Sequence, residues 1–391
     1  MAIKELKKNI YWVGSIDWDR RLFDELIPLP DGTSYNSYLI KGTEKTALID
    51  TVDPSKEDDL LDNLNELHIE NLDYLIVNHA EQDHSGSIPI ILELFPNAKV
   101  ITNEKCKKIL IDHLLIKKDR IITIQDYDTL SLGNKTLKFI FASWVHWPET
   151  MLTYLEEDKI LFSCDLFGSH IADSSIWMKD ESKVYFAAKR YYAEIMMPFR
   201  KNIRKHLEKI DKLTIKMIAP SHGQVFTYPD FILSAYNDWV SDKVKNEVVI
   251  PYISMHGSVA EMVHILTDEL IKKDIDVKPF NLTSTDIGEM AMAMVDAATI
   301  IIASPTVLSG AHPGIVSAVY LANALRPKLR YASIIGSFGW GGKMSENISG
   351  MLKNLNVELL STVLIKGYPK DKDIDLLKNL AKEISEKHKL I

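Results

Sequence analysis

The sequence predicts two domains of mixed structure, an α+β domain followed by an α/β domain built on a doubly wound parallel sheet. The chain has 391 residues, which exceeds the size at which one hydrophobic core keeps growing. Near residue 247 an irregular pattern of strands and helices gives way to a regular alternation of strand and helix. A polar, charged stretch, Asp242 to Asn246, separates the two patterns. We therefore expect domains at 1–246 and 247–391.

Short apolar strands broken by turns dominate the first domain. Helical stretches are expected at 55–67 and 104–115, and a longer one at about 187–213, before the domain closes near 219–225. This irregular mixture is typical of an α+β domain. The expected strands are 10–13, 35–40, 47–50, 74–78, 100–102, 121–124, 137–142, 151–155 and 160–164.

The second domain alternates apolar strands with amphipathic helices. In the helix after the first strand, apolar residues recur at steps of three and four and form one core-facing stripe. Five strands joined by such helices predict a parallel doubly wound sheet. The expected strands are 248–254, 277–282, 300–304, 332–336 and 358–365.

The composition excludes several classes of function. The formal net charge is -8 and the isoelectric point is about 5.9, which argues against nucleic acid or an anionic membrane as a partner. No stretch approaches the ~20 apolar residues of a membrane helix, and the start has no signal-peptide pattern, so a cytoplasmic protein is expected. The two cysteines, Cys106 and Cys164, form no disulfide framework, zinc ribbon or C-x-x-C motif.

A dense block of ligand-type residues follows the expected strand 74–78. It reads His79-Ala-Glu81-Gln-Asp83-His84 and lies at a strand end, where loops carry function. In extended backbone, alternate residues face the same way, so His79, Glu81 and Asp83 are expected to converge, with His84 reached as the chain turns into a helix. Four such residues within six positions would otherwise need separate hydrogen-bond explanations, which favours a metal site.

Three further candidates end apolar runs: His146 in a Trp-Val-His-Trp-Pro sequence, Asp165 in Ser-Cys-Asp-Leu-Phe-Gly, and His222 in Pro-Ser-His-Gly. Taken singly, each is more simply a cap, a turn residue or a satisfied core group. Together with the dense block they supply four imidazoles and three carboxylates.

This arrangement resembles the metallo-β-lactamase superfamily, whose usual first block is H-x-H-x-D-H and which usually binds zinc. Here Glu81 replaces the second His. With His146, Asp165 and His222 following in order, the sequence resembles the flavodiiron proteins over essentially the whole chain. A carboxylate in place of an imidazole hardens the site and favours redox-active iron, although zinc and manganese stay open.

The resemblance implies a metallo-β-lactamase-like αββα sandwich followed by a flavodoxin-like, five-stranded doubly wound sheet. It also implies two non-haem irons. One iron would be held by His79, Glu81 and His146, the other by Asp83, His84 and His222, with Asp165 as the bridge.

The roles of four neighbouring residues stay open. Asp50 is either an acceptor for a ligand histidine or a turn residue in Asp-Thr-Val-Asp-Pro. Tyr191 and Tyr192 either approach the metal pocket or are buried helical aromatics, and His170 is equally open. Cys164 precedes Asp165 and, in a strand, points the opposite way, so we expect it in the core.

Three loops at the carboxyl ends of strands in the second domain predict a flavin site. In a sheet ordered 2-1-3-4-5 they lie side by side at the switch point. The first loop offers hydroxyls and a helix N-terminus to a phosphate, without Lys or Arg, as flavodoxins do. The others offer glycines and the Trp340 ring to a flat ligand, so FMN is expected, although any one loop alone could be a plain turn. The candidate residues are Ser254, Met255, His256, Gly257, Ser258, Val259, Ser304, Pro305, Thr306, Val307, Leu308, Gly310, Ser337, Phe338, Gly339, Trp340, Gly341 and Gly342.

The resemblance implies an oxidoreductase that passes electrons from an external donor through FMN to the irons, where dioxygen is reduced to water. Nitric oxide reduction with the same cofactors is the first alternative, and a zinc hydrolase is a weaker one. The donor would be rubredoxin or, as in the methanogen group, a reduced deazaflavin coenzyme (factor 420). The family also implies a head-to-tail homodimer or a dimer of dimers.

Overall fold

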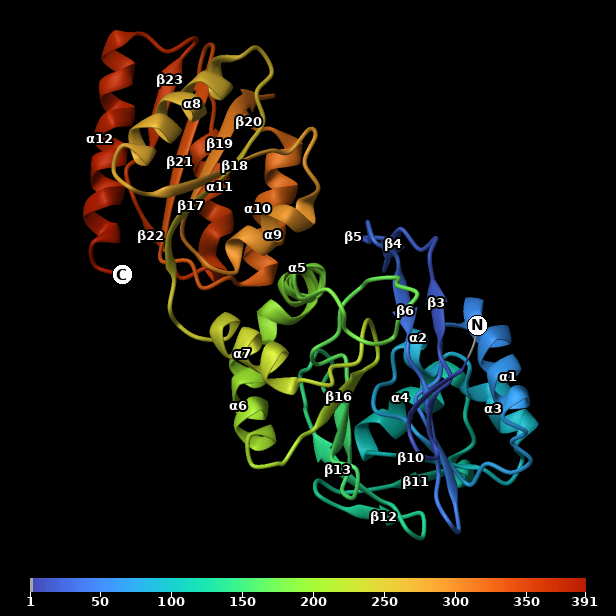
Figure 1. The fold of residues 1–391 in the computed structure, drawn as a ribbon. Coiled ribbons are helices and arrows are strands. Elements are labelled where there is room, and N and C mark those ends of the chain that lie inside the picture. The colour runs from blue at the N-terminus through green and yellow to red at the C-terminus, as the bar shows by residue number, and fades with distance from the viewer. Residues whose placement is uncertain (1–2) are drawn as a thin grey trace. The chain divides into compact units, whose positions relative to one another are not determined.

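The computed structural model describes residues 3–391 (Figure 1). It divides into two compact units. The first comprises the residues up to Tyr192 together with Phe199–Val240, and the second comprises Ala193–Pro198 and Ser241–Ile391. The chain thus passes between units after Val240, and β17 (Lys245–Tyr252) opens the second sheet. Among the described residues, no helix combines the length and apolar character needed to cross a membrane.

The first unit is an αββα sandwich of two sheets. The larger sheet has the order β1-β2-β7-β8-β9-β10-β11, antiparallel up to β8 and parallel from β8 onward. Its strands are β1 (Lys4–Lys7), β2 (Ile10–Trp12), β7 (Tyr38–Lys41), β8 (Thr46–Ile49), β9 (Tyr74–Ile76), β10 (Lys99–Thr102) and β11 (Ile121–Thr123).

The smaller sheet has the order β12-β13-β14-β15-β16 and is antiparallel except for the β15–β16 pair. Apolar residues such as Trp12, Phe139 and Phe162 fill the space between the two sheets. This inter-sheet core fixes the position of the strand ends that carry the site. The strands are β12 (Thr129–Ser131), β13 (Thr136–Phe141), β14 (Met151–Leu155), β15 (Ile160–Cys164) and β16 (Met217–Pro220).

Helices cover both outer faces. On the larger sheet, Leu60, Ile88 and Leu110 from three helices share a second core with strand residues such as Leu48 and Leu75. Beside the smaller sheet, α6 contacts the chain after β13 through the bond from His206 Nε2 to the Ser143 carbonyl (2.9 Å). The helices are η1 (Pro54–Lys56), α1 (Glu57–Glu66), α2 (Gln82–Ser85), α3 (Ile88–Leu94), α4 (Glu104–Leu114), η2 (Lys118–Arg120), α5 (Glu181–Tyr191), α6 (Arg200–Ile210) and α7 (Pro229–Trp239).

The expected long helix at 187–213 is wrong in two respects. Helix α5 begins earlier, at Glu181, because the Asp180 side chain accepts from the Lys183 N–H (3.0 Å) and caps it. It then gives way to a π-helix, Tyr192–Met196, and a 3-10 turn, Met197–Phe199, before α6. Pro198 lies in this interruption, and a proline lacks the N–H that a continuous helix requires.

The expected strand 35–40 is split into β6 (Thr33–Tyr35) and β7. Asn36 lies at the break, where its side chain bonds Trp12 Nε1 and the carbonyls of Pro220 and Gly223 in place of a strand partner. Five short strands of this unit were not expected: β1 and β12, β3 (Ser15–Asp17), which pairs with β6, and the hairpin β4 (Leu22–Phe23) and β5 (Ile27–Pro28).

The second unit is a parallel doubly wound sheet of order β18-β17-β19-β21-β22, which is the expected 2-1-3-4-5 order. Helices α8 and α12 share one core with the sheet. The elements are α8 (Ser258–Ile271), β18 (Asp276–Asn281), α9 (Ile287–Met294), β19 (Ala297–Val307), β20 (Gly310–Ala311), α10 (Pro313–Leu325), β21 (Tyr331–Phe338), α11 (Met344–Met351), η5 (Leu352–Asn354), β22 (Glu358–Leu359), β23 (Val363–Lys366) and α12 (Asp371–His388).

Two strands of this sheet differ from the prediction. The fifth strand is interrupted, and its halves β22 and β23 both pair with β21. The third strand continues past Ser304 to Val307 and folds back through β20, so that a hairpin stands where an open loop was expected. Leu308 and Ser309 form its tip with φ values of 47° and 65°, the left-handed backbone of a tight hairpin turn.

Candidate functional site

The four histidines and three carboxylates expected as metal ligands lie together in the first unit, and we call them the ligand cluster. They come from strand ends, from the start of one short helix and from one connection between strands. His79 follows β9, Glu81 precedes α2, and Asp83 and His84 lie within α2. His146 lies between β13 and β14, Asp165 follows β15, and His222 follows β16.

The alternating pattern expected for the dense block holds only as far as Glu81. Glu81 is extended (φ -61°, ψ 144°), and α2 begins at the next residue. Asp83 therefore reaches the site from a helical turn and not from extended backbone. This change of direction separates Asp83 and His84 from His79 and Glu81, and it creates two ligand groups from one short segment.

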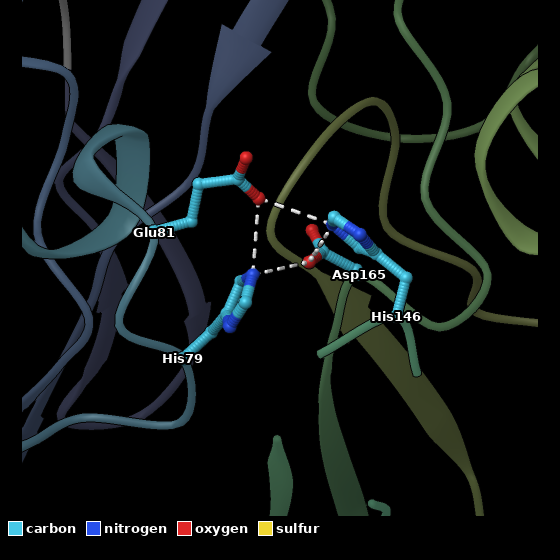
Figure 2. Close-up of side chains that lie close together, drawn as sticks. All are labelled: His79, Glu81, His146 and Asp165. Atoms are coloured by element: carbon cyan, nitrogen blue, oxygen red, sulfur yellow. Dashed lines mark hydrogen bonds and ion pairs between the residues drawn. The ribbon is translucent and has the colours of Figure 1, made fainter. Parts of the chain in front are cut away.

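The first group surrounds Glu81 and is shown in Figure 2. Glu81 Oε2 lies 3.1 Å from the Nε2 atoms of both His79 and His146. Asp165 Oδ2 lies 3.5 Å from His79 Nε2 and 3.6 Å from His146 Nε2. Three side chains thus present their ligand atoms to one point, with one oxygen of Asp165 beside it.

The second group is formed by Asp83, His84 and His222. Asp83 lies 3.5 Å from His84 Nε2 through Oδ1 and 3.2 Å from His222 Nε2 through Oδ2. Asp165 Oδ1 lies 3.1 Å from His84 Nε2 and 3.4 Å from His222 Nε2. Asp165 therefore directs one oxygen to each group, which is the arrangement of a bridging carboxylate.

Several buried atoms of the ligand cluster make no hydrogen bond among the described residues. They include both carboxylate oxygens of Asp83, Nε2 of His84 and Oδ2 of Asp165. Buried polar atoms are nearly always satisfied, and an exception needs an explanation such as an ion. These atoms converge without bonding one another, and imidazole nitrogens with carboxylate oxygens suit a transition metal. The residues therefore fit metal binding.

Opposite charges packed in a buried space shift the pKa values strongly. Burial alone would lower the pKa of His222, but the carboxylates of Asp165 and Asp83, 3.4 Å and 3.2 Å from its Nε2, raise it to about 10. Burial alone would raise the pKa of Asp165, yet the positive charges of His84 and His222, whose Nε2 atoms lie 3.1 Å and 3.4 Å from Oδ1, hold it well below its usual range. The strong negative field of the carboxylates thus attracts positive charge to this point.

Of the neighbouring residues whose roles were open, some contact the ligand cluster and others do not. Tyr191 donates from its hydroxyl to Asp165 Oδ1 (2.9 Å), whereas Tyr192 donates to the Trp239 carbonyl (3.2 Å). The His170 ring lies 5.0 Å from that of His222, and its Nδ1 bonds Thr33 Oγ1 at 2.9 Å. Cys164 is buried, as expected.

Among the residues that the structure describes, Asp50 makes no hydrogen bond to a histidine. It accepts from the backbone N–H of Asn78 (2.7 Å) and from its side-chain amide (3.0 Å). Burial raises the pKa of the Asp50 carboxyl to about 6. The Asn78 amide oxygen accepts in turn from the Thr153 hydroxyl (2.7 Å). Asp50 therefore links the ends of β8 and β9 to β14 through Asn78.

The sequence interpretation missed Glu149. This buried residue accepts from His79 Nδ1 (2.7 Å) and from the Ala80 N–H (3.1 Å). The signal available was an acidic residue three positions after His146, which alone is weak. The hairpin β4–β5 was also missed, although Phe23 places its ring 5.1 Å from that of His170.

The three expected flavin loops, 254–259, 304–310 and 337–342, lie at the carboxyl edge of the second unit's sheet, and we call them the edge loops. Ser258 and Ser337 share a hydrogen bond (2.8 Å), which joins the first loop to the third. The Ser309 carbonyl accepts from the Lys343 N–H (2.7 Å), which joins the hairpin to the same loop. The loops therefore form one continuous edge.

Each edge loop has a feature that suits a flat phosphorylated ligand. Gly257, with φ of 88°, precedes α8, and Ser254 Oγ accepts from the Ala260 N–H (3.1 Å) at that helix's first turn. Gly342 has φ of 152°, and a Cβ there would lie 2.6 Å from Thr306. Trp340 and Leu308 are 95% and 97% exposed.

Known proteins match this chain over nearly its whole length. A family model described as ODP family beta lactamase matches residues 33–223. The nitric oxide reductase of Moorella thermoacetica is 35% identical over 96% of this chain and 96% of its own length. The coenzyme F420H(2) oxidase of Methanothermobacter marburgensis is 33% identical over 91% of this chain and 90% of its own. The crystal structure of the flavodiiron protein from Giardia intestinalis superposes with a TM-score of 0.94 and 28% identity, covering 99% of this chain and 97% of that one.

Proposed function

The chain belongs to the flavodiiron protein family, and from this premise we propose that it is an oxidoreductase that reduces dioxygen to water at a di-iron centre. Electrons would pass from an external donor through FMN to the irons. Full-length relatives more than 30% identical to this chain carry the names of an oxidase and a reductase. The proposed domains are 1–246 for the irons and 247–391 for FMN.

The observation that carries the proposal is the pairing of two ligand groups around Asp165. His79, Glu81 and His146 would hold one iron, and Asp83, His84 and His222 the other. The Asp165 carboxylate would join them, because its two oxygens face different groups. Two irons held there would supply redox-active metal ions and open coordination positions for a diatomic gas.

The residues of this chain prepare the site in three ways. Tyr191 holds Asp165 by a hydrogen bond to Oδ1, which keeps the carboxylate between the groups. The Ser34 carbonyl accepts from His222 Nδ1 (2.7 Å), so Nε2 of that ring is left to face the centre. Five of the seven side chains of the ligand cluster are buried, which limits the access of bulk water and protects a reduced site from side reactions.

The edge loops would hold FMN. The phosphate would lie at the N-terminus of α8, where Ser254 and Ser258 offer hydroxyls and backbone N–H groups are free of helical partners. Gly339, Gly341 and Gly342 allow backbone to approach the ring system, and Trp340 offers a stacking face.

We propose a reduced deazaflavin coenzyme or rubredoxin as the donor. A relative 33% identical to this chain is named for oxidation of coenzyme F420H(2), which favours the deazaflavin. A head-to-tail homodimer, or a dimer of such dimers, would place FMN of one chain beside the irons of another. The proposed location is the cytoplasm.

Nitric oxide reduction to nitrous oxide is the second candidate. It is favoured by the relative named nitric oxide reductase, which is 35% identical over 96% of both chains. Both gases need the same ligand set, so the proposed cofactors do not change.

Anaerobic purification followed by measurement of iron, zinc and flavin per chain tests the proposal. We expect about two irons and one FMN, identified by mass after release. Oxygen and nitric oxide consumption would then be compared with reduced deazaflavin coenzyme and with reduced rubredoxin. Zinc without flavin would overturn the redox function and favour a hydrolase.

A further inference from the structure

Glu149 lies behind the ligand cluster and contacts His79 on the side away from it. It is 1% exposed, and Oε1 accepts both from His79 Nδ1 (2.7 Å) and from the Ala80 N–H (3.1 Å). Its backbone carbonyl accepts from the Asn103 side chain (2.5 Å), which also caps α4. Glu149 is thus held from two sides, and its carboxylate has a fixed direction.

His79 and His222, one imidazole from each ligand group, differ in the acceptor that their Nδ1 atoms meet. His79, in the first group, donates from Nδ1 to a carboxylate, whereas His222, in the second, donates from Nδ1 to the neutral Ser34 carbonyl. Both bonds are 2.7 Å long, so the difference is one of charge and not of distance. A carboxylate acceptor makes an imidazole a stronger electron donor than a carbonyl does.

The free-energy cost of burying the Glu149 carboxylate indicates that its charge has a function at this site. Oε2 of Glu149 is buried and makes no hydrogen bond among the described residues. Within the same residues, no Lys or Arg pairs with it, and its ion-pair partner is His79. A buried carboxylate is costly unless it is compensated, and a ring that carries positive charge from a bound metal provides that compensation.

We propose that Glu149 is a positioning residue that makes the two irons electronically unequal. It holds His79 with the proton on Nδ1 and the lone pair of Nε2 toward the ligand cluster. Its negative charge stabilises the oxidised state of the iron beside His79, so that this iron is reduced second. The inference rests on the proposed di-iron function and adds an order to the two reduction steps.

The test compares the purified iron- and FMN-containing wild type with Glu149→Gln, which keeps an acceptor but removes the charge. A redox titration monitored by electron paramagnetic resonance measures the largest fraction of protein in which one of the two irons is reduced. We expect the equilibrium constant that favours the half-reduced pair to fall about 10-fold or more, because the gap between the two steps narrows. The matched control is Glu247→Gln, which neutralises a buried glutamate of the second unit that pairs with Lys278.

A Glu149→Gln protein that keeps two irons and the wild-type constant would overturn this inference alone. A wild type without two irons would overturn the proposed function as well. If Glu149→Gln does not fold, proton NMR of the reduced wild type decides. Two slowly exchanging imidazole N–H signals are then expected, from His79 and His222, and a single one would overturn the role of Glu149.

Discussion

The ligand cluster and the edge loops carry the two halves of the proposed function, but they are built differently. Most of the ligand cluster is buried, with Glu81 and His146 half-buried, and its side chains are fixed by partners such as Glu149, Ser34 and Tyr191. The edge loops are joined mainly by backbone and hydroxyl contacts, and their largest side chains, Leu308 and Trp340, are almost fully exposed.

The difference follows from the chemistry that each site needs. Metal-ligating atoms must be held in position within a few tenths of an ångström, and hydrogen bonds from neighbouring residues provide this support. A flavin offers a large flat surface and a phosphate, and backbone N–H groups with a few hydroxyls suffice for it. Substitutions in the first unit should therefore affect iron, and those in the second should affect flavin.

The largest effect is expected for Asp165→Asn. This change removes the charge that lies beside four imidazoles, and the neutral amide places an N–H₂ group toward one of the two ligand groups. We expect loss of most bound iron and a fall in oxygen or nitric oxide consumption of at least ~100-fold. FMN content should stay near one per chain. Iron analysis and absorbance of the flavin measure both in one preparation, and a parallel loss of flavin would contradict the separation of the two sites.

The second prediction applies the same logic to the edge loops. Gly342→Ala places a Cβ 2.6 Å from Thr306 at a φ of 152°, so we expect local strain of about 1–3 kcal/mol and FMN binding weakened by about 10-fold or more. Bound iron should not change. Gly350→Ala is the matched control, because Gly350 lies in α11, outside the edge loops, and a Cβ there meets nothing within 4 Å. Fluorescence titration of the flavin-depleted protein with FMN measures both, and equal affinities would contradict a close approach of Gly342 to the ligand.

A smaller effect is expected for Tyr191→Phe, which removes the hydroxyl bonded to Asp165. A hydrogen bond to a charged group contributes about 1.5–3 kcal/mol, so iron retention under chelator challenge should fall by about 10-fold. Tyr192→Phe is the control, because its hydroxyl donates to a backbone carbonyl outside the ligand cluster. The same loss of iron in both variants would indicate general loosening of α5 instead.

The sequence allowed the residues of the ligand cluster to be located because each one stands in or after an apolar, strand-like run or in the dense block that follows one. Strands 151–155 and 160–164 have the expected bounds, and Asp165 follows directly. The parallel, doubly wound character of the second sheet was also predictable from alternation, whereas its strand order was expected from the likeness to flavodoxins. These features depend on periodicity and on strand ends, which are local properties of a sequence.

What the sequence could not predict depends on distant partners. Glu149 meets His79 across 70 positions, and nothing near either residue marks the pairing. Asp50 was a reasonable acceptor for a ligand histidine, but the Asn78 amide is closer and takes both of its oxygens. Pro198 is a local signal for the break in the helix, but the apolar spacing on both sides of it favoured one continuous helix.

The smallest prediction contrasts two buried histidines. Anionic partners raise the pKa of His222 to about 10, whereas burial lowers the pKa of His388, in the second unit, to about 4. His388 lies between neutral partners, with Nε2 bonded to Thr299 (2.7 Å) and Nδ1 to Asn246 (2.7 Å). A histidine without an anion beside it is a structural link between α12, β19 and the start of β17, and we expect no role for it in catalysis.

A lowered histidine pKa gives stability that is complete above the unfolded value, near 6.5, and is lost as the pH falls through about 4. Between pH 7 and pH 5 the second unit should lose about 1–2 kcal/mol from this group. His388→Gln keeps a donor and an acceptor but cannot titrate, so its thermal unfolding should vary less over this range while its activity at pH 7 matches wild type. If His388→Gln unfolds with the same pH dependence as wild type, the acid sensitivity of the second unit arises from another group. If His388→Gln loses activity, His388 is not a purely structural histidine, and its contrast with His222 fails.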